Sequence, residues 1–415
     1  MGKLIASPTP LPFSVNDKQL FQATLGLKAP WFVSDVKLNK VEKKLDIFID
    51  FERGAWFPCP ECQSPCEVHD TNQRTWRHLD FFEYETFPHA RVPRASCPKH
   101  GARQVELPWA CPSSGFTLHI EAMVLALSDE MSVAGIAGHL NVNEDSIWRI
   151  LQHYVNEARK NVDLSHVDQL AIDEFAVQKG HRYVTFFYDL KGRRVIHIAE
   201  GKGKESFTSF VQATEGRLDP GKIKLVCLDM QPSFIGGCRE TFPAAVMVFD
   251  HFHVIKLLND TINRIRLAEA RENGELKETE FLWLKNPDNL TAEQKQRFLH
   301  VKDLDIRTAK AYQFKLAIQR TWELPPQAAR RYLQRWIAWA ERCNLPEMAK
   351  LAKSVRDHLD GIVESVRQRV TSGYAEGLNN KIRTAFRRAY GFKAKEYRDT
   401  MIYLVAGGLS LPTQY

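Results

Sequence analysis

Two carboxylic acids beside strand-like apolar runs are the residues of this sequence best placed for chemistry. Asp173 interrupts the first apolar run of residues 171–201, and Asp229 directly follows the continuous apolar run 225–228. Two carboxylates that face one another repel unless a cation lies between them. Oxygen ligands of this kind suit Mg²⁺, which keeps several of its waters and also binds phosphate oxygens. Two such ions can activate an attacking oxygen and stabilise a leaving one, so the pair indicates phosphodiester chemistry.

A third carboxylate usually completes such a site, and Glu376 is the best candidate for it. Helical spacing over residues 371–392 gives one apolar stripe and puts Glu376 at the head of a second, polar face. Side chains four, seven and eleven residues further on share that face. We therefore expect an acid to lead a row of phosphate-binding groups. The DNA-binding residues predicted in this segment are Asn380, Arg383, Arg387 and Arg388.

The formal net charge of +7 at pH 7 is concentrated in one segment of the chain. Residues 366–398 contain nine lysines and arginines against two glutamates, an excess that equals the charge of the whole chain. A local basic stripe favours a polyanionic partner, most often a nucleic acid. For an isolated run of charge, the alternative is a solvated helical face. This alternative is less favoured here because Glu376, the predicted third carboxylate, lies in the same segment.

Four cysteine and histidine residues have the spacing of a zinc site. Cys59 and Cys62 form a C-x2-C pair, and Cys97 and His100 form a C-x2-H pair further along the chain. Each pair can place two ligands on one tight turn, and together they supply the tetrahedral nitrogen and sulfur set of structural zinc. Free core thiols are the alternative. We expect zinc to stabilise a small β-rich unit without taking part in catalysis. Competing residues for the fourth ligand position are Cys66 and His69.

Between residues 116 and 160 the apolar period changes from two to about 3.6, which predicts three short helices. Only residues 141–143 separate the second helix from the third, and Asn143 is a suitable N-cap for the third. In a helix-turn-helix the last helix enters the major groove, so Ser146 and Arg149 are predicted to contact DNA. A plain three-helix bundle fits the spacing equally well, and the zinc module directly before it favours the DNA-binding interpretation.

The elements that must position the acids follow one another in an informative order. Residues 171–201 form three predicted strands joined by glycine-containing turns, and a helical segment follows. The run 225–228 is apolar throughout, as expected of a strand buried on both faces, and a second such run ends at Asp250. This is the order of a ribonuclease H-like mixed sheet. In that topology the middle of the first strand lies beside the end of the fourth, which brings Asp173 close to Asp229.

Glu174, the neighbour of Asp173, is an alternative ligand. Side chains alternate between the two faces of a regular strand, so Glu174 is expected to point away from Asp173 and to be the weaker ligand. If Glu174 is nonetheless the ligand, then Asp173 is a turn or edge acid and Glu376 is a surface residue.

Two further segments complete the predicted α+β, multidomain architecture. Residues 264–371 lie between the second aspartate and Glu376, and their apolar spacing is mostly helical, which predicts an all-helical insertion. Near the N-terminus, apolar and polar residues alternate over 33–51, which predicts a hairpin of two strands.

Length and composition place the chain among large soluble proteins. Its 415 residues suggest roughly two to four domains, and 44% hydrophobic residues are enough to form real cores. No cationic start followed by an apolar region is present at the N-terminus, and the apolar stretch 401–412 is too short to span a bilayer. A reducing, cytoplasmic location is the default, so the eight cysteines are interpreted as thiols or metal ligands.

With these motifs in place, the sequence resembles the bacterial insertion-sequence transposases of the ISL-three type, members of the D-D-E group. The resemblance covers nearly the whole chain. It implies a zinc-binding N-terminal domain, a helix-turn-helix, and a ribonuclease H-like nuclease interrupted by a helical insertion before the final glutamate. Carried over by motif, the catalytic triad that binds Mg²⁺ or Mn²⁺ is Asp173, Asp229 and Glu376. The most specific parts are CPEC, RTWRHLD, LPWACP, AIDEFAVQKGHRYVT, FDHFHVIKLLND and SGYAEGLNNKIRTAFRRAYGF.

The same resemblance implies a supporting D-x2-H signature, formed in this chain by Asp250 and His253. One departure is His100, which ends the second zinc pair where related chains often have cysteine. The implied partners are DNA, both as element terminal inverted repeats and as target, and further copies of the chain assembled on DNA. The implied location is the bacterial cytoplasm, in association with the nucleoid and without a membrane partner.

The predicted activity is hydrolysis of a phosphodiester at the element end, followed by transfer of the freed 3′-hydroxyl into target DNA. One alternative is a zinc and helix-turn-helix regulator whose nuclease-like domain is inert, and another is a metal-dependent nuclease without strand transfer. Convergence of the three carboxylates favours either enzyme over the regulator.

The predicted segments are an N-terminal hairpin segment (1–52), a zinc-binding domain (53–113), a helix-turn-helix (114–162), the first catalytic part (163–263), the helical insertion (264–371) and the final catalytic helices with Glu376 (372–415).

Overall fold

The computed structural model describes residues 16–178, 182–302, 306–370 and 373–413. The chain divides into two compact units, one formed up to residue 154 together with the segment from 410 onward, and one formed by residues 155–409. Within the described ranges, no helix combines the length and the apolar character that crossing a membrane requires.

The first unit is built on a β-sheet whose first two strands confirm the hairpin predicted over 33–51. These strands, β1 (Trp31–Asn39) and β2 (Lys44–Phe51), pair antiparallel, and β2 then pairs parallel with the long strand β7 (Tyr84–Cys97). The sheet therefore continues across residue 52, where the sequence suggested a boundary. The strands antiparallel to β7 are β5 (Val68–Thr75), β6 (His78–Phe81) and β8 (Gly101–Gln104). Helix α1 (Asp17–Thr24) precedes this sheet, and β3 (Phe57–Pro58) and β4 (Pro65–Cys66) form a separate short pair.

The sequence pattern does not predict strand β7, because the strand contains Pro88 and Pro93. Proline is uncommon in a central strand. Both prolines nevertheless take part in hydrogen bonding through their carbonyl groups. Pro88 O accepts from the N–H of Trp76 at 3.0 Å, and Pro93 O accepts from the N–H of Val105 at 3.2 Å. Each proline thus contributes to the fold as an acceptor alone.

Aromatic rings fill the core beside this sheet. Trp31 contacts Trp109 and Phe51, with ring centroids 4.9 and 5.6 Å away and nearly perpendicular ring planes. Trp109 also meets Trp76 edge-on at 5.7 Å. All four rings are buried, and rings of this size remove a large apolar area from water. The unit therefore has an apolar core besides its predicted metal site.

Helices α2 (Leu118–Ser128), α3 (Val133–Leu140) and α4 (Glu144–Lys160) follow the sheet. Asn141 ends α3 with a φ of 50°, the left-handed conformation common after a helix. Asn143 caps α4 as predicted, because its Oδ1 accepts from the N–H of Asp145 at 2.7 Å. The short turn between α3 and α4 is thus fixed at both ends.

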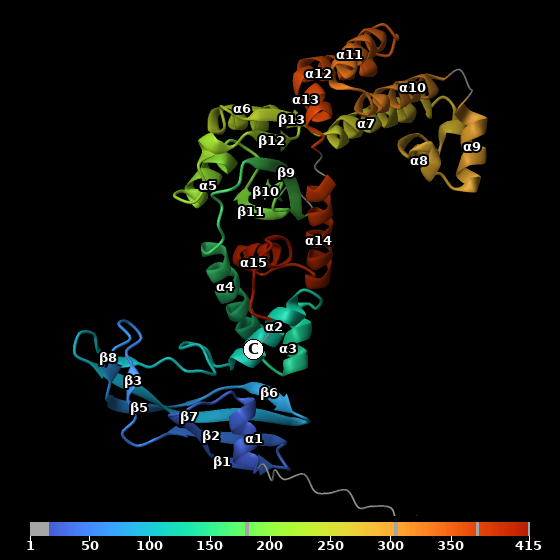
Figure 1. Ribbon diagram of the computed structural model, residues 1–415. Coiled ribbons are helices and arrows are strands. Elements are labelled where there is room, and N and C mark those ends of the chain that lie inside the picture. Colours follow the sequence, from blue (N-terminus) through green and yellow to red (C-terminus); the bar gives the residue numbers. More distant parts are fainter. Residues whose placement is uncertain (1–15, 179–181, 303–305, 371–372, 414–415) are drawn as a thin grey trace, which may run out of the picture. The chain divides into compact units, whose positions relative to one another are not determined.

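The second unit contains the mixed sheet that the sequence predicts around the acids (Figure 1). Its strand order is β11-β10-β9-β12-β13, with β9, β10 and β11 antiparallel and β12 and β13 parallel to β9. The pairing of β9 with β12 matches Ile172 to Leu228, so Asp173 and Asp229 come next along their respective strands. The bounds are β9 Gln169–Gln178, β10 Arg182–Asp189, β11 Arg194–Glu200, β12 Leu225–Leu228 and β13 Val246–Phe249.

Helices cover both faces of this sheet. On one face, Ile172 of β9 belongs to the core that also contains Phe207 of α5 and Phe234 of α6. On the other face, Phe175 of β9 meets Phe386 of α14 edge-on at 5.7 Å. Figure 1 shows α14 running along the side of the sheet. The bounds are α5 Glu205–Thr214, α6 Pro232–Thr241, α14 Gly373–Ala389 and α15 Lys395–Ala406.

A helical region separates β13 from α14, and no strand interrupts it within the described ranges. It begins with α7 at His251, before residue 264, where the sequence placed the start of an all-helical insertion. It packs on the sheet through α13, where a Cβ added at Gly361 would overlap the ring of Phe249. Gly361 therefore permits a close approach of helix and strand. The bounds are α7 His251–Glu269, α8 Glu280–Leu284, α9 Ala292–Lys302, α10 Arg307–Gln319, α11 Pro326–Glu341, α12 Pro346–Asp357 and α13 Leu359–Gln368.

Candidate metal centres and DNA-binding surfaces

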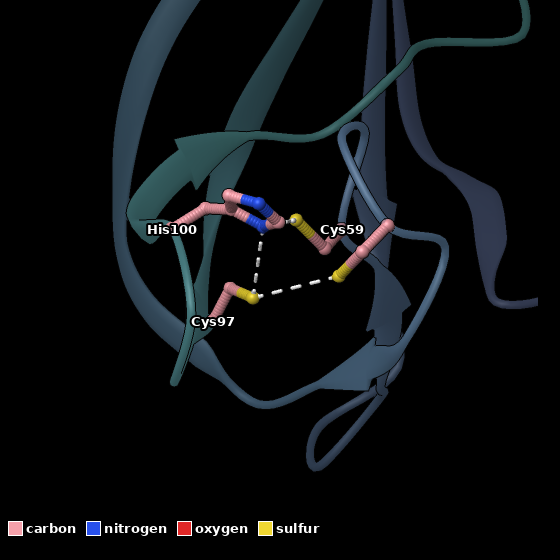
Figure 2. A group of neighbouring side chains, drawn as sticks. Cys59, Cys97 and His100 are labelled. Carbon is pink, nitrogen blue, oxygen red and sulfur yellow. Dashed lines mark hydrogen bonds between the residues drawn. The ribbon is translucent and has the colours of Figure 1, made fainter.

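Four side chains from two tight turns gather at one point of the first unit. The ligand atoms of Cys59, Cys62, Cys97 and His100 all lie within 4.8 Å of one another. His100 Nδ1 lies 3.6 Å from Cys59 Sγ and 3.5 Å from Cys97 Sγ. Figure 2 shows these side chains turned toward one another. The sulfurs of Cys62 and Cys97 are 3.7 Å apart. A tetrahedral zinc centre with bonds of roughly 2.0–2.3 Å has edges of about 3.5–3.8 Å, so the predicted set has the size of a zinc site.

Backbone geometry holds these ligands in place. In the first turn, Gln63 adopts a φ of 59° and its N–H donates to Cys59 O at 2.8 Å. In the second turn, Gly101 follows His100 with a φ of 70°, where glycine avoids strain. Burial raises the pKa of the Cys97 thiol, but backbone amides and the His100 ring outweigh it and bring the pKa to about 6. Cys97 therefore favours the thiolate form that binds metals.

The competing ligands have other contacts. Cys66 Sγ lies 3.3 Å from the carbonyl oxygen of Ser64, and burial together with the neighbouring thiols raises its pKa. His69 Nδ1 lies 3.2 Å from the carboxylate of Asp70. Neither Cys66 nor His69 belongs to the group of four. The geometry thus favours His100 as the fourth ligand.

In the second unit, two of the predicted acids lie beside one another. Strands β9 and β12 pair Ile172 with Leu228, so Asp173 within β9 lies next to Asp229, which directly follows β12. Burial raises the pKa of Asp173, and the charge of Asp229 adds to this effect, whereas a neighbouring imidazole and amide oppose it. The carboxylates are therefore close enough to repel, which is the situation that a bound cation relieves.

The two residues of the D-x2-H signature have different structural roles. Asp250 is fully buried at the start of α7, where its Oδ1 accepts from the N–H of Phe252 at 3.2 Å as the N-cap of the helix. One turn later, His253 Nδ1 lies 3.5 Å from Oδ2 of Asp229. Asp250 thus fixes the helix, and His253 contacts the acid pair.

Asn379 joins α14 to the acid pair, although no motif pointed to it. Its Nδ2 donates to Oδ2 of Asp173 at 2.9 Å, and its Oδ1 accepts from the hydroxyl of Tyr188 at 2.6 Å. Asn379 is 3% exposed and Tyr188 is 1% exposed. The sequence does contain a signal, because Asn379 lies beside Leu378 on the buried side of the helix. A polar residue at such a position needs a hydrogen-bond partner inside the protein.

Glu376 is exposed in the first turn of α14, three residues before Asn379. Residues three apart are neighbours on a helix surface, so Glu376 lies on the turn that contacts Asp173. The three carboxylates are not gathered as tightly as the zinc ligands. Across the described ranges, only the cysteine and histidine set has three or more such ligand atoms within 4.8 Å of one another. The structure therefore pairs two of the acids and puts the third on the helix beside them.

Glu174 lies on the face of β9 opposite to Asp173. Its cross-strand neighbour is Thr185, whose hydroxyl accepts from Ser206 of α5 at 3.2 Å. Asp173 instead contacts α14 on the other face. One oxygen of Glu174, Oε1, is buried without a hydrogen-bond partner in the part of the chain that the structure describes. This geometry does not bring Glu174 to the acid pair.

Three of the four residues of α14 that were predicted to bind DNA lie on its exposed face. Asn380, Arg383 and Arg387 are exposed, whereas Arg388 is half-buried. Arg383 Nη1 donates to Asn380 Oδ1 at 3.0 Å, and its guanidinium lies 5.3 Å from the ring centroid of Phe175. Phe175 belongs to the strand that carries the first acid. Arg383 thus reaches toward that strand.

Ser146 and Arg149 line a cleft of about 740 Å³ in the first unit. Arg149 Nη2 donates to Ser146 Oγ at 2.9 Å. Asn141 and Asn143 of the preceding turn line the same cleft, as does Arg77 from the sheet region. Polar groups of this kind can meet phosphates and base edges, and the two predicted contacts with DNA stay predictions.

Three parts of the chain match known protein families. Residues 57–100 match the zinc-finger of transposases IS204, IS1001, IS1096 and IS1165, and residues 105–155 match the helix-turn-helix domain of transposase family ISL3. Residues 170–402 match the transposase domain of the DDE type from the same family. Fold and matches together define a DNA-binding transposase with a zinc finger. The chain belongs to the ISL3 family of insertion-sequence transposases, as its motifs implied.

Individual relatives agree with this family. The transposase for insertion sequence element IS1001 of Bordetella parapertussis is 28% identical over 353 residues, which cover 82% of this chain and 86% of the relative. The transposase for insertion sequence element IS1557 of Mycobacterium tuberculosis is 24% identical over an alignment of 429 positions, which covers 95% of this chain and 96% of the relative. The similarity therefore extends over most of each protein.

Proposed function

We propose that this transposase cuts and joins DNA with two Mg²⁺ or Mn²⁺ ions held by Asp173, Asp229 and Glu376. The observation that carries this proposal is the parallel register of β9 and β12, which sets Asp229 beside Asp173. The strand order β11-β10-β9-β12-β13, with its antiparallel and parallel parts, supports a ribonuclease H-like fold for the unit.

The residues at this point fit a hard divalent cation. The donors are carboxylate oxygens, which Mg²⁺ and Mn²⁺ prefer. Burial and the charge of Asp229 raise the pKa of Asp173, so a cation between the two would favour their ionised forms. When bound, such ions supply an activated water and stabilise charge on the reacting phosphate.

The protein side chains would hold the acids in position. Asn379 donates to Oδ2 of Asp173 and would keep this carboxylate in one orientation. His253 lies against Oδ2 of Asp229 and can donate to it when its Nδ1 carries a proton. We expect the exposed carboxylate of Glu376 to close on the aspartates when cation and DNA bind.

One acid site can serve both steps of the reaction. In the first step a water oxygen bonds to phosphorus at the element end, and the bond from phosphorus to the 3′-oxygen breaks. In the second step the freed 3′-hydroxyl attacks a phosphorus of target DNA and displaces a 3′-oxygen there. Asn380, Arg383 and Arg387 lie on the helix that carries Glu376 and would hold the backbone on either side of the reacting phosphate.

DNA recognition would fall to α2, α3 and α4 as a three-helix unit, with Ser146 and Arg149 of α4 reading or positioning the element end. The family match gives one helix-turn-helix per chain, while an insertion sequence has two ends. We therefore infer that at least two copies of the chain act together on DNA. Zinc at Cys59, Cys62, Cys97 and His100 would be structural.

A strand-transfer assay with end-containing DNA and a target duplex tests this function. The proposed transposase yields a nicked end and then a joined product, both dependent on Mg²⁺ or Mn²⁺. A nuclease without strand transfer would give only the nick, and a regulator would bind without cutting. Glu174→Gln is the matched control for Asp173→Asn, because Glu174 lies on the opposite face of the same strand.

A further inference from the structure

An exposed aromatic residue with a strained backbone lies between α14 and α15. Tyr390 directly follows the last residue of α14, is 98% exposed and has a φ of 51°. Glycine is the usual residue in this conformation after a helix, because a bulky side chain is disfavoured there. A ring exposed to this extent gains almost nothing from packing. A strained, exposed aromatic residue therefore suggests a role in binding.

Tyr390 lines a cavity of about 490 Å³. Aromatic rings form part of the wall, since Phe386 and Phe392 also line the cavity with their ring centroids 5.0 Å apart. The volume lies within the range of roughly 300–1,000 Å³ that is typical of sites for small ligands. The cations that line the same cavity are Lys393, Lys395 and Arg398.

These cations are not equivalent. Lys395 and Arg398 both pair with Glu200 at the end of β11, so part of their charge is neutralised. Lys393 is exposed. It is therefore the cation best suited to meet a phosphate beside the aromatic wall.

We propose that this cavity binds one unpaired nucleotide of the substrate DNA, with its base stacked on Tyr390 and its phosphate on Lys393. A base inside a duplex has both faces covered by its neighbours, so a free aromatic ring beside a cavity suits a base that has left the stack. Stacking of bases on aromatic side chains is largely independent of base identity, so such a site requires no particular base at this position.

This inference rests on the proposed function, because α14 carries Glu376 near its other end. Tyr390 lies fourteen positions after Glu376, which is roughly 21 Å at the rise of an α-helix. DNA lying along α14 would pass the cavity about six base pairs from the acids, at 3.4 Å per base pair. The unpaired nucleotide is therefore expected about six positions from the reacting phosphate.

Binding measurements without divalent cation test this site in the full-length protein. The probes are a 12-nucleotide single strand of mixed sequence and an end-containing duplex with one mismatch moved along it. Wild type should bind more tightly when the mismatch lies about six positions from the cleavage point. Tyr390→Ala should weaken single-strand binding roughly 5- to 100-fold, the range for loss of base–aromatic stacking, and abolish the mismatch effect. Tyr390→Phe should retain both properties.

Two further variants distinguish a role of Tyr390 in DNA binding from a purely structural role at the end of α14. Tyr390→Gly should relieve the backbone strain and raise the melting temperature while still losing single-strand affinity, whereas a mere helix-ending role predicts no loss of affinity. Phe281→Ala is the matched control, because Phe281 is an aromatic residue of α8 that is 61% exposed and does not line the cavity. It should bind single strands like wild type.

Wild-type affinity in both Tyr390→Ala and Tyr390→Gly would overturn the inference, as would the absence of any mismatch effect in wild type. Cleavage of fully paired end DNA, measured in parallel, distinguishes failure of the proposed transposase function from failure of the nucleotide site at Tyr390. Binding that depends on Tyr390 without cleavage would contradict the proposed function alone. Cleavage with binding independent of Tyr390 would contradict this site alone.

Discussion

The carboxamide of Asn379 donates to Oδ2 of Asp173 over 2.9 Å and joins two residues 206 positions apart in the chain. Tyr188 holds the oxygen of the same carboxamide. A buried amide bonded at both of its polar atoms cannot rotate without losing a hydrogen bond. The orientation of Asp173 is therefore tied to the helix that carries Glu376 and the basic face.

Asn379→Ala should slow cleavage of end DNA roughly 10- to 100-fold, the usual effect of removing a group that orients a metal ligand. The rate should rise again with more Mg²⁺ if the loss lies in metal affinity. Asn380→Ala is the control, since Asn380 is exposed on the next position of the helix. It should change DNA affinity more than the cleavage rate. Equal cleavage rates in wild type and Asn379→Ala at low Mg²⁺ would contradict this role.

Asp173 gives the stability of the second unit a pH dependence in the absence of divalent cation. Folding raises its pKa, chiefly through burial, so between the ordinary value near 3.9 and the raised value the folded chain binds more protons than the unfolded chain. Stability then falls as pH rises through this window. Asp173→Asn removes the charge and retains an acceptor for Asn379.

We therefore expect Asp173→Asn to melt at or above the wild-type temperature at pH 7 in EDTA, with the difference shrinking toward pH 4. Added Mg²⁺ should stabilise wild type more than the variant. Glu376→Gln should leave melting in EDTA unchanged, because Glu376 is exposed. A large loss of stability in Glu376→Gln with cleavage preserved would mean that the glutamate is structural.

Zinc should depend on the four clustered ligands and on no other cysteine. Cys59→Ser and Cys97→Ser should reduce bound zinc from about one ion per chain to nearly none, measured by atomic spectroscopy. Cys66→Ser should keep the metal, because Cys66 is buried nearby but lies outside the group. Full zinc content in both Cys59→Ser and Cys97→Ser would exclude this site.

Loss of zinc should loosen the two ligand turns more than the sheet. Cys59 and Cys97 belong to the same core as Trp31 and Trp109, but most of that core consists of aromatic and aliphatic side chains. Part of the unit should therefore keep its amide protection without zinc. Hydrogen exchange of Cys59→Ser provides the check. Faster exchange should be concentrated near residues 57–66 and 97–104.

Arg383 and Arg387 should contribute charge rather than sequence readout. Changing either to alanine should weaken DNA binding for all sequences and lower the slope of log affinity against log salt by about 0.9 per lost phosphate contact. Arg330→Ala is the control, because Arg330 pairs with Asp360 at 2.7 Å within the helical insertion. Unchanged salt slopes for Arg383→Ala and Arg387→Ala would remove α14 from the DNA-binding surface.

Local patterns were sufficient to predict the elements around the acids. The run 225–228 became β12, and the helical period after the third strand became α5 at Glu205–Thr214. The zinc set was also accessible, because each ligand pair lies on one turn and needs no long-range information. Apolar spacing and ligand spacing both report on contacts within a few residues.

Contacts between distant segments could not be read in the same way. The partner of Asn379 is on a strand at the other end of the unit's sequence, and nothing local distinguishes Asn379 from Asn380 except its place on the buried side of the helix. Strand β7 was hidden by Pro88 and Pro93, whose use as acceptors depends on neighbours from elsewhere in the chain. Such features depend on tertiary packing and not on local propensity.

The most direct test of this account is cleavage of end-containing DNA by wild type and Asp229→Asn, with and without Mg²⁺, alongside the affinity of each for the same DNA. We predict that wild type releases a strand with a 3′-hydroxyl only in Mg²⁺ or Mn²⁺. Asp229→Asn should bind the end nearly as well and cut at background level. Cleavage by Asp229→Asn at the wild-type rate, or cleavage by wild type in EDTA, would contradict an active site built on Asp173 and Asp229.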